Sequence, residues 1–129
     1  MKNLLISVYS FGFQKSGIPD NGFEDGGGFV FDCRFLPNPH NDPKLREFTG
    51  LDQQIKEFFS DYRSVKSFID DCVKMVEKAA LSYIEKKYSN LQVSFGCTGG
   101  RHRSVYCSEE VSKILKAKGF EINLTHIEI

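Results

Sequence analysis

The chain has 129 residues, of which 17 are basic and 17 acidic, so its formal net charge is zero. A chain of this length buries about two thirds of its unfolded surface around one core, which predicts a single domain over residues 1–129 without a structural disulfide. Zero net charge gives no global field that would attract nucleic acid, and no apolar run approaches the roughly 20 residues that span a bilayer.

The alternation of apolar and polar segments predicts the first elements of the chain. Residues 3–10 alternate and are rich in leucine, isoleucine and valine, which predicts a strand. Residues 14–28 combine glycines with acidic residues, which predicts a mobile loop. Residues 29–36 are almost continuously apolar, which indicates a second strand that is buried on both faces of a parallel or mixed sheet.

The middle of the chain is predicted to be helical. Three prolines within residues 37–43 first predict an extended, rigid connection that holds His40 in place. Apolar residues then recur at helical spacing over residues 52–60 and 65–88, which predicts a short helix and a long one.

The last third of the chain completes the pattern. We expect a third strand over residues 91–95, a helix over residues 104–118 and a fourth strand over residues 120–129. His126, in the last strand, is assigned no functional role. The whole order predicts an α/β sandwich, in which helices flank a mostly parallel or mixed sheet of four strands or slightly more.

The most informative run lies between the third strand and the last helix, at residues 96–104. A strand that ends in a glycine-rich turn and leads into a helix presents unpaired backbone N–H groups and the positive end of the helix dipole at one point. Arg101 and Arg103 add charge-assisted hydrogen bonds, each worth roughly 1.5–3 kcal/mol when partly desolvated. The run therefore predicts a phosphate-binding loop.

Other polar residues are predicted to reach the same place. Ligands of open parallel sheets collect beyond the carboxyl ends of the strands. Ser10 and Gly12 follow the first strand, and Asp32 and Arg34 lie near the end of the second, so we expect one polar cleft with residues 97–103. Because Asp32 and Arg34 are two residues apart on a predicted strand, they point to one face, where they pair with each other or reach a shared polar cavity.

The cysteines are even in number and widely spaced, at Cys33, Cys72, Cys97 and Cys107. We expect four reduced thiols. A zinc site built from Cys33, His40, Cys97 and His102 matches no metal-ligand spacing, so no metal is expected. Reduced thiols, together with an amino-terminal apolar run too short for a secretion signal, predict a cytoplasmic protein that does not bind membranes.

A catalytic alternative exists for the glycine-rich run. Residues 97–104 fit the pattern C-x5-R-[ST] of cysteine-dependent phosphatases, in which a thiolate at a helix amino terminus attacks phosphorus while an arginine holds the phosphate oxygens. Cys97 would be the nucleophile, Arg103 the phosphate ligand, and Asp25 or Asp32 the general acid. In the simpler interpretation, Cys97 is a small residue that packs under a binding loop.

The sequence resembles the C-terminal domain family of the bacterial RNase adapter RapZ in four blocks, at residues 10–13, 29–40, 45–46 with 49–52, and 96–105. The resemblance spans almost the whole chain and implies an architecture similar to part of phosphofructokinase. It also implies a phosphosugar-like anion pocket that senses glucosamine-6-phosphate, and in RapZ proper an interaction with small regulatory RNA. The implied ligand-binding residues are Asp32, Arg34, His40, Cys97, Thr98, Gly99, Gly100, Arg101 and Arg103, and the glycine-rich run adds His102 and Ser104.

These observations predict a non-catalytic sensor for a phosphorylated small molecule, such as a hexosamine phosphate, without a cofactor. The loop N–H groups and arginines would bind the phosphate, and Asp32 and His40 the sugar hydroxyls or the amine. The alternatives are the phosphatase and an RNA-binding or protein-adapter module.

Three departures from the family limit what the resemblance implies. The glycine-rich segment 21–28 is longer than the family's usual connection between the first two strands, which leaves the size of the pocket open. The chain has no G-x-x-x-x-G-K-[ST] motif, so nucleotide hydrolysis is not expected to carry over. Residues 123–129 are apolar and slightly acidic where the RNA-binding member has a basic extension, so RNA is not expected as a partner. A protein partner and self-association through exposed strand edges are consistent with the sequence.

Overall fold

The computed structural model describes residues 4–20, 22 and 27–129. Its elements, in chain order, are β1 (Leu5–Gly12), β2 (Gly28–Asp32), the 3₁₀ turn η1 (Pro39–Asn41), α1 (Gln53–Ser60), α2 (Arg63–Glu85), β3 (Asn90–Cys97), α3 (Arg103–Ala117) and β4 (Glu121–His126). Strands and helices follow one another in the predicted order. The predicted α/β class, with helices flanking a four-stranded sheet, is confirmed.

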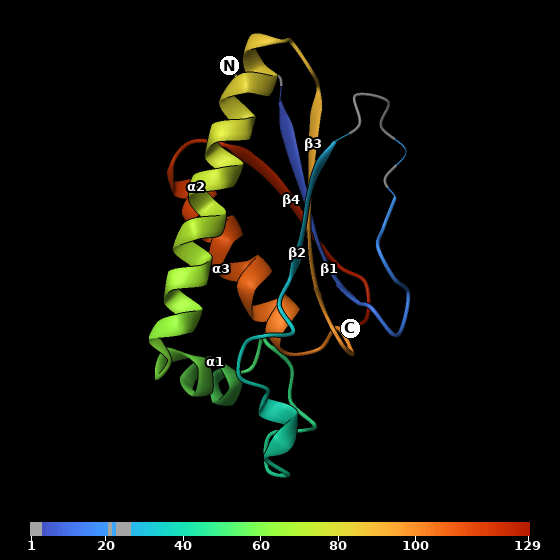
Figure 1. The fold of residues 1–129 in the computed structure, drawn as a ribbon, viewed down its shortest axis with the longest axis vertical. Helices are drawn as coiled ribbons and strands as arrows, with labels where there is room; N and C mark the ends of the chain where they lie inside the picture. Colours follow the sequence, from blue (N-terminus) through green and yellow to red (C-terminus); the bar gives the residue numbers. More distant parts are fainter. Residues whose placement is uncertain (1–3, 21, 23–26) are drawn as a thin grey trace.

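The strands form a parallel sheet in the order β2-β3-β1-β4. β1 and β3 pair along their whole length and end together, with Gly12 opposite Cys97. Asp32, at the end of β2, lies opposite Gly96. Because all four strands run the same way, their carboxyl ends and the loops that follow them meet at one edge of the sheet (Figure 1).

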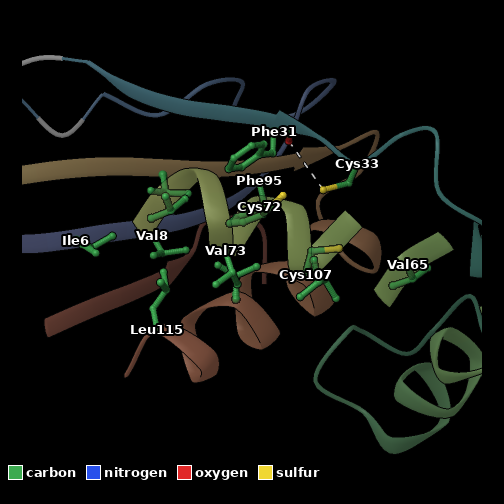
Figure 2. Close-up of a cluster of buried hydrophobic side chains, with 14 of the residues drawn as sticks. Ile6, Val8, Phe31, Cys33, Val65, Cys72, Val73, Phe95, Cys107 and Leu115 are labelled. Carbon is green, nitrogen blue, oxygen red and sulfur yellow. Dashed lines mark hydrogen bonds between the residues drawn. The ribbon is translucent and has the colours of Figure 1, made fainter. Parts of the chain in front are cut away.

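The hydrophobic core lies between the sheet and the helices α2 and α3, which cover the same face (Figures 1 and 2). Leu91, Val93 and Phe95 alternate along β3 and are fully buried, and each such side chain contributes roughly 1.5–3 kcal/mol through burial. α2 supplies the helical stripe that the sequence predicts. Its buried members are Val65, Ile69, Cys72, Val73, Val76 and Ala80.

The opposite face of the sheet carries the polar side chains of Ser7, Asn90, Gln92 and Ser94. Residues 13–20 pass along this face (Figure 1). The side-chain amide of Asn90 donates to Oγ of Ser7 over 2.7 Å, and that of Gln92 donates to the carbonyl of Pro19 over 2.7 Å. These bonds satisfy polar groups that the loop shields from water. Residues 21 and 23–26 of the predicted mobile loop lie outside the described residues.

The second strand is shorter and more exposed than the sequence indicates. β2 ends at Asp32 because the chain then turns, and the N–H of Leu36 donates to the carbonyl of Cys33 over 3.1 Å. The prediction of burial on both faces is wrong, since β2 is an edge strand and Val30 is 47% exposed. Arg34 lies in the turn after β2, so it does not share a strand face with Asp32.

The proline-rich segment is not extended throughout, because its middle forms the turn η1. The side-chain oxygen of Asn38 accepts a hydrogen bond from the N–H of His40 over 3.1 Å, and the N–H of Asp42 donates to the carbonyl of Pro39 over 2.9 Å. Proline fits the first position of such a turn because its missing N–H would have no partner there. Pro39 is buried, which fixes the exposed His40 to the body of the domain.

His126, at the end of β4, fastens that strand to β1 and α3. Its Nδ1 lies 2.6 Å from Oγ of Ser10, and its Nε2 lies 2.7 Å from a carboxylate oxygen of Glu109. Both ring nitrogens therefore have partners, whichever of them carries the proton. The sequence assigned this residue no role, and the structure gives it a structural one.

We expect Ser10→Ala to lower the free energy of unfolding by about 1–2 kcal/mol, because Nδ1 of His126 loses its partner in a largely buried place. Urea denaturation measures this loss. Ser112→Ala is the matched control, since Ser112 is also buried but its Oγ has no partner in the described part of the chain. Equal losses in the two variants would contradict the role given to the hydrogen bond.

Candidate functional site

A cavity of about 230 Å³ opens at the carboxyl edge of the sheet, between the β3–α3 loop and the segment that follows β2. Its lining residues are Asn38, His40, Cys97, Thr98, Gly99, Arg101, His102 and Arg103. All of them except Asn38 belong to the set that the sequence analysis proposes. The structure thus brings His40 beside the glycine-rich loop, although more than 50 residues separate them in the chain.

The β3–α3 loop directs the amino terminus of α3 toward this cavity. α3 begins at Arg103, and the side chain of its N-cap residue, His102, makes no capping hydrogen bond within the described residues. The backbone N–H groups of that turn and the positive end of the helix dipole therefore remain available to an anion. Gly100 allows the loop to turn back, because its φ of 75° lies in the left-handed region that glycine adopts without strain.

Arg103 is a buried cation without an ion pair in the described part of the chain. The residue is only 5% exposed. Nη1 donates to the carbonyls of Arg34 over 2.7 Å and Leu36 over 3.3 Å, while the buried Nε has no partner among the described residues. Buried charges are normally paired, whereas the hydrogen bonds of this guanidinium go only to carbonyls. Arg103 helps to lower the pKa of Asp32, but that carboxylate is hydrogen-bonded to Arg34.

His102 is the second buried group with an unused polar atom. The residue is 6% exposed, and its Nε2 has no hydrogen-bond partner in the described structure. Burial lowers the pKa of His102, although hydrogen bonds to the backbone of Phe48 and Arg46 act in the opposite direction. The ring is therefore neutral at pH 7 and offers one N–H donor and one acceptor.

Arg101 and Cys97 complete the loop side of the cavity. The half-buried Arg101 donates from Nη2 to the carbonyl of Glu47 over 3.1 Å, which leaves other N–H donors of its guanidinium for a ligand. Cys97 is 3% exposed, and its Sγ lies 3.2 Å from Oγ of the buried Ser104. Cys97 and Ser104 thus contact each other under the loop, and Ser104 does not line the cavity.

Asp32 and Arg34 pair with each other, which was one of the two expected arrangements. Nη2 of Arg34 donates to the Asp32 carboxylate over 2.7 Å, and this hydrogen bond holds the pKa of Asp32 below its ordinary value. The guanidinium also lies over the ring of Phe13, 4.0 Å from its centre. Neither Asp32 nor Arg34 lines the cavity. The pair instead braces the turn whose carbonyls hold Arg103.

Asn38 is a cavity residue that sequence reasoning missed. Its Oδ1 is occupied by the N–H of His40, so its amide N–H₂ group remains as the donor. The Asn-Pro pair favours a turn at this point, and that local signal could have identified the residue. Gly100, which the sequence analysis included, packs behind the loop against Gly12 and does not line the cavity.

The four cysteines are free thiols and are all buried. Cys33, Cys72 and Cys107 lie in the core rather than at the cavity (Figure 2). Burial, reinforced by the neighbouring Cys107, raises the pKa of Cys33. The described residues contain no group of three or more histidine, cysteine, aspartate or glutamate side chains arranged to hold a metal ion. Asp25, a candidate general acid, lies outside the described residues.

A larger cavity of about 320 Å³ lies at the opposite edge of the sheet, beside Leu4 and Phe120. Its walls are mainly apolar, and its lysine, Lys118, lies 3.5 Å from the carboxylate of Glu77. Because that cation already has a counter-ion, this cavity lacks the unpaired positive charge found at the carboxyl edge.

None of the helices within the described residues is long and apolar enough to cross a membrane.

The neutral His102 leads to a test with sulfate, whose charge does not change between about pH 5 and 8. We expect the affinity for sulfate to rise as the pH falls from 7.5 to 5, because protonation of His102 adds a positive charge beside the anion and its lowered pKa places this step below the ordinary histidine range. Calorimetric titration at the two pH values measures the effect. The His102→Gln variant keeps His40 and should show a smaller gain, whereas an unchanged gain would contradict the assignment.

Fold and cavity together define an α/β domain whose cleft lies at the carboxyl ends of a parallel four-stranded sheet, where open sheets of this kind bind their ligands. The sequence model described as the RapZ C-terminal domain matches residues 4–129, and the chain belongs to this family.

Several relatives of this chain are named nucleotide-binding proteins. One from Pseudothermotoga lettingae is 44% identical over 125 residues, which are 97% of this chain and 42% of the relative. One from Thermotoga neapolitana is 40% identical over 124 residues, which are 96% of this chain and 42% of that protein. One from Haemophilus influenzae is 42% identical over 132 aligned residues, with 97% and 42% coverage. The chain thus spans less than half the length of these relatives.

Proposed function

We propose that this domain binds a small phosphorylated molecule, specifically a hexosamine phosphate such as glucosamine-6-phosphate, and acts as a sensor without chemical turnover. The observation that carries the proposal is the buried Arg103, which has no ion pair within the described residues and lies at the uncapped amino terminus of α3. A phosphate monoester supplies the missing negative charge. Its oxygens match the fork geometry of a guanidinium and the N–H groups of a helix end.

The size of the cavity supports a small metabolite. Its 230 Å³ falls below the roughly 300–1,000 Å³ of sites for drug-sized ligands. With the phosphate beside Arg103 and Arg101, the sugar would extend toward Asn38 and His40. The amide of Asn38 would donate a hydrogen bond to a hydroxyl oxygen, and the acceptor nitrogen of the neutral His102 would accept one from a hydroxyl or ammonium group.

Because Asp32 is paired with Arg34, the amine of the sugar is expected to bind elsewhere. The resemblance implies that this carboxylate bonds the sugar or the amine, but its two oxygens are occupied by Arg34. We therefore assign the amine to the histidines of the cavity rather than to Asp32.

Calorimetric titration with glucosamine-6-phosphate tests this function. Glucosamine and inorganic phosphate serve as controls for the two halves of the ligand, and glucose-6-phosphate tests the amine. We expect the phosphosugar to bind more tightly than either half. Absence of binding by the phosphosugar, with a folded protein, would contradict the proposal.

The phosphatase alternative is weakened by the environment of Cys97. Cys97 lines the cavity, but the residue is only 3% exposed, whereas a nucleophile must be reached by phosphorus. We expect no hydrolysis of an aryl phosphate by the wild-type protein. Hydrolysis that disappears in Cys97→Ser would instead assign the chain to the cysteine-dependent phosphatases.

Regulation would require that occupancy of the cavity be reported to another molecule. We propose a cytoplasmic protein partner for this step rather than RNA, because the chain has no net positive charge. An RNA affinity that falls with salt by several powers of ten would overturn that choice. The candidates for this partner include a second copy of this chain, and the partner would be identified as a protein whose binding to this domain depends on the phosphosugar.

A further inference from the structure

Glu128 makes three hydrogen bonds to residues 12–16, the segment that packs against the β3–α3 loop (residues 98–102), which is called the anion-binding loop below. One carboxylate oxygen, Oε2, accepts from the backbone N–H of Gly12 over 3.1 Å and from that of Ser16 over 2.9 Å. The other, Oε1, accepts from the hydroxyl of Ser16 over 3.2 Å. The carboxylate thus bridges the end of β1 to the loop that follows it, from a position more than 110 residues away in the chain.

Gly12 in turn lies directly against the anion-binding loop. A Cβ atom on Gly12 would come within 2.7 Å of the carbonyl carbon of Gly99. A Cβ atom on Gly100 would come within 2.6 Å of the nitrogen of Gly12 and within 2.4 Å of Cγ of Glu128. These close approaches show that Glu128, Gly12 and the Gly99–Gly100 backbone are packed together with no room for a side chain between them.

Two hydrogen bonds join the same segments from the next residues along the chain. The N–H of Phe13 donates to the carbonyl of Cys97 over 2.8 Å, and the N–H of Gln14 donates to the carbonyl of Thr98 over 3.1 Å. Within residues 12–16, Gly12 and Ser16 are therefore hydrogen-bonded to Glu128, whereas Phe13 and Gln14 are hydrogen-bonded to Cys97 and Thr98. A shift of residues 12–16 would move the backbone of the loop that borders the cavity.

We propose that Glu128 is a positioning residue of the anion site: it fixes Gly12 and Ser16, and through them the backbone of Gly99 and Gly100. The expected effect on affinity rests on the proposed binding function, whereas the effect on the position of the loop does not. Glu128 does not line the cavity, so it acts through the loop and not by touching the ligand.

The charge of Glu128 and its hydrogen bonds have opposite effects on an anion. A carboxylate behind the loop repels a phosphate, whereas its hydrogen bonds hold the loop in the shape that binds one. Glutamine keeps the bonds, because its side-chain oxygen can accept from both N–H groups and its amide nitrogen can face Oγ of Ser16. Alanine removes both the bonds and the charge.

The test compares Glu128→Ala and Glu128→Gln with Glu121→Ala, which removes a carboxylate at the opposite end of β4. Affinity for glucosamine-6-phosphate is measured by calorimetry, and the amide resonances of Gly12, Gly99 and Gly100 by NMR without ligand. We expect about five- to tenfold weaker binding in Glu128→Ala, affinity equal to or above wild type in Glu128→Gln, and no change in Glu121→Ala.

Each other outcome has a defined meaning. Wild-type affinity in Glu128→Ala would overturn the inference, as would a loss in Glu128→Gln as large as that in Glu128→Ala. If the wild-type protein binds no phosphosugar, the proposed function fails, and the ligand-free resonances decide the inference separately. Displaced Gly99 and Gly100 signals in Glu128→Ala, restored in Glu128→Gln, would support positioning, and unchanged signals would contradict it.

Discussion

Replacement of Arg103 by methionine is expected to weaken phosphosugar binding by at least about 100-fold. The guanidinium is buried and has no ion pair in the described structure, so a bound phosphate would be its counter-ion. Breaking a buried, hydrogen-bonded charge pair costs roughly 3–5 kcal/mol, and every 1.4 kcal/mol is a factor of ten in affinity. Calorimetry with glucosamine-6-phosphate measures the loss.

The stability of the ligand-free protein should change less in this variant than its affinity. Methionine leaves the carbonyls of Arg34 and Leu36 without a donor, but it also removes the desolvation penalty of a buried charge. Arg101→Met is the matched control, because Arg101 is half-buried and should lose only about tenfold in affinity. Equal losses in the two variants would contradict the central place given to Arg103.

The largest expected effect on stability comes from Gly100→Ala. An added Cβ would lie 2.4 Å from Cγ of Glu128, 2.6 Å from the nitrogen of Gly12 and 2.8 Å from the carbonyl carbon of Phe11. The φ of 75° adds a penalty for any residue with a side chain. Overpacking costs about 1–3 kcal/mol and the left-handed conformation about 1–2 kcal/mol, so we expect a loss of about 3 kcal/mol in the free energy of unfolding.

The neighbouring glycine provides the control for this prediction. A Cβ on Gly99 would meet no atom within 4 Å, and its φ is not in the left-handed region. Gly99→Ala should therefore change the free energy of unfolding by less than about 1 kcal/mol. Urea denaturation of both variants provides the comparison. A tolerated alanine at Gly100 would show that the loop does not pack against Gly12 and Glu128 as described.

The parts of the fold that the sequence predicts depend on local patterns. The α2 stripe from Val65 to Ala80 follows from helical spacing, and the order of strands and helices is sufficient for the α/β class. The glycine-rich run between β3 and α3 is also a local signal, because strand, turn and helix follow one another without interruption. These features require no knowledge of which distant segments pack together.

The parts that the sequence did not predict depend on long-range pairing. An apolar run such as residues 29–36 does not reveal whether its strand lies at the edge of the sheet, so the exposure of Val30 could not be foreseen. The sequence left two arrangements open for Asp32, and the turn after the end of β2 decides between them: Asp32 pairs with Arg34 and does not line the cavity. The contact between Glu128 and Gly12 likewise arises only when β4 is placed beside β1.

The measurement that tests the location of the site most directly is an NMR titration of backbone amides with glucosamine-6-phosphate. We predict that the largest shifts occur at residues 98–103 and near Asn38 and His40, which border the carboxyl-edge cavity. Amides beside the other cavity, at Leu81 and Phe120, should change little. Shifts that are largest at Leu81 and Phe120, with residues 98–103 unaffected, would contradict the assignment of the anion site.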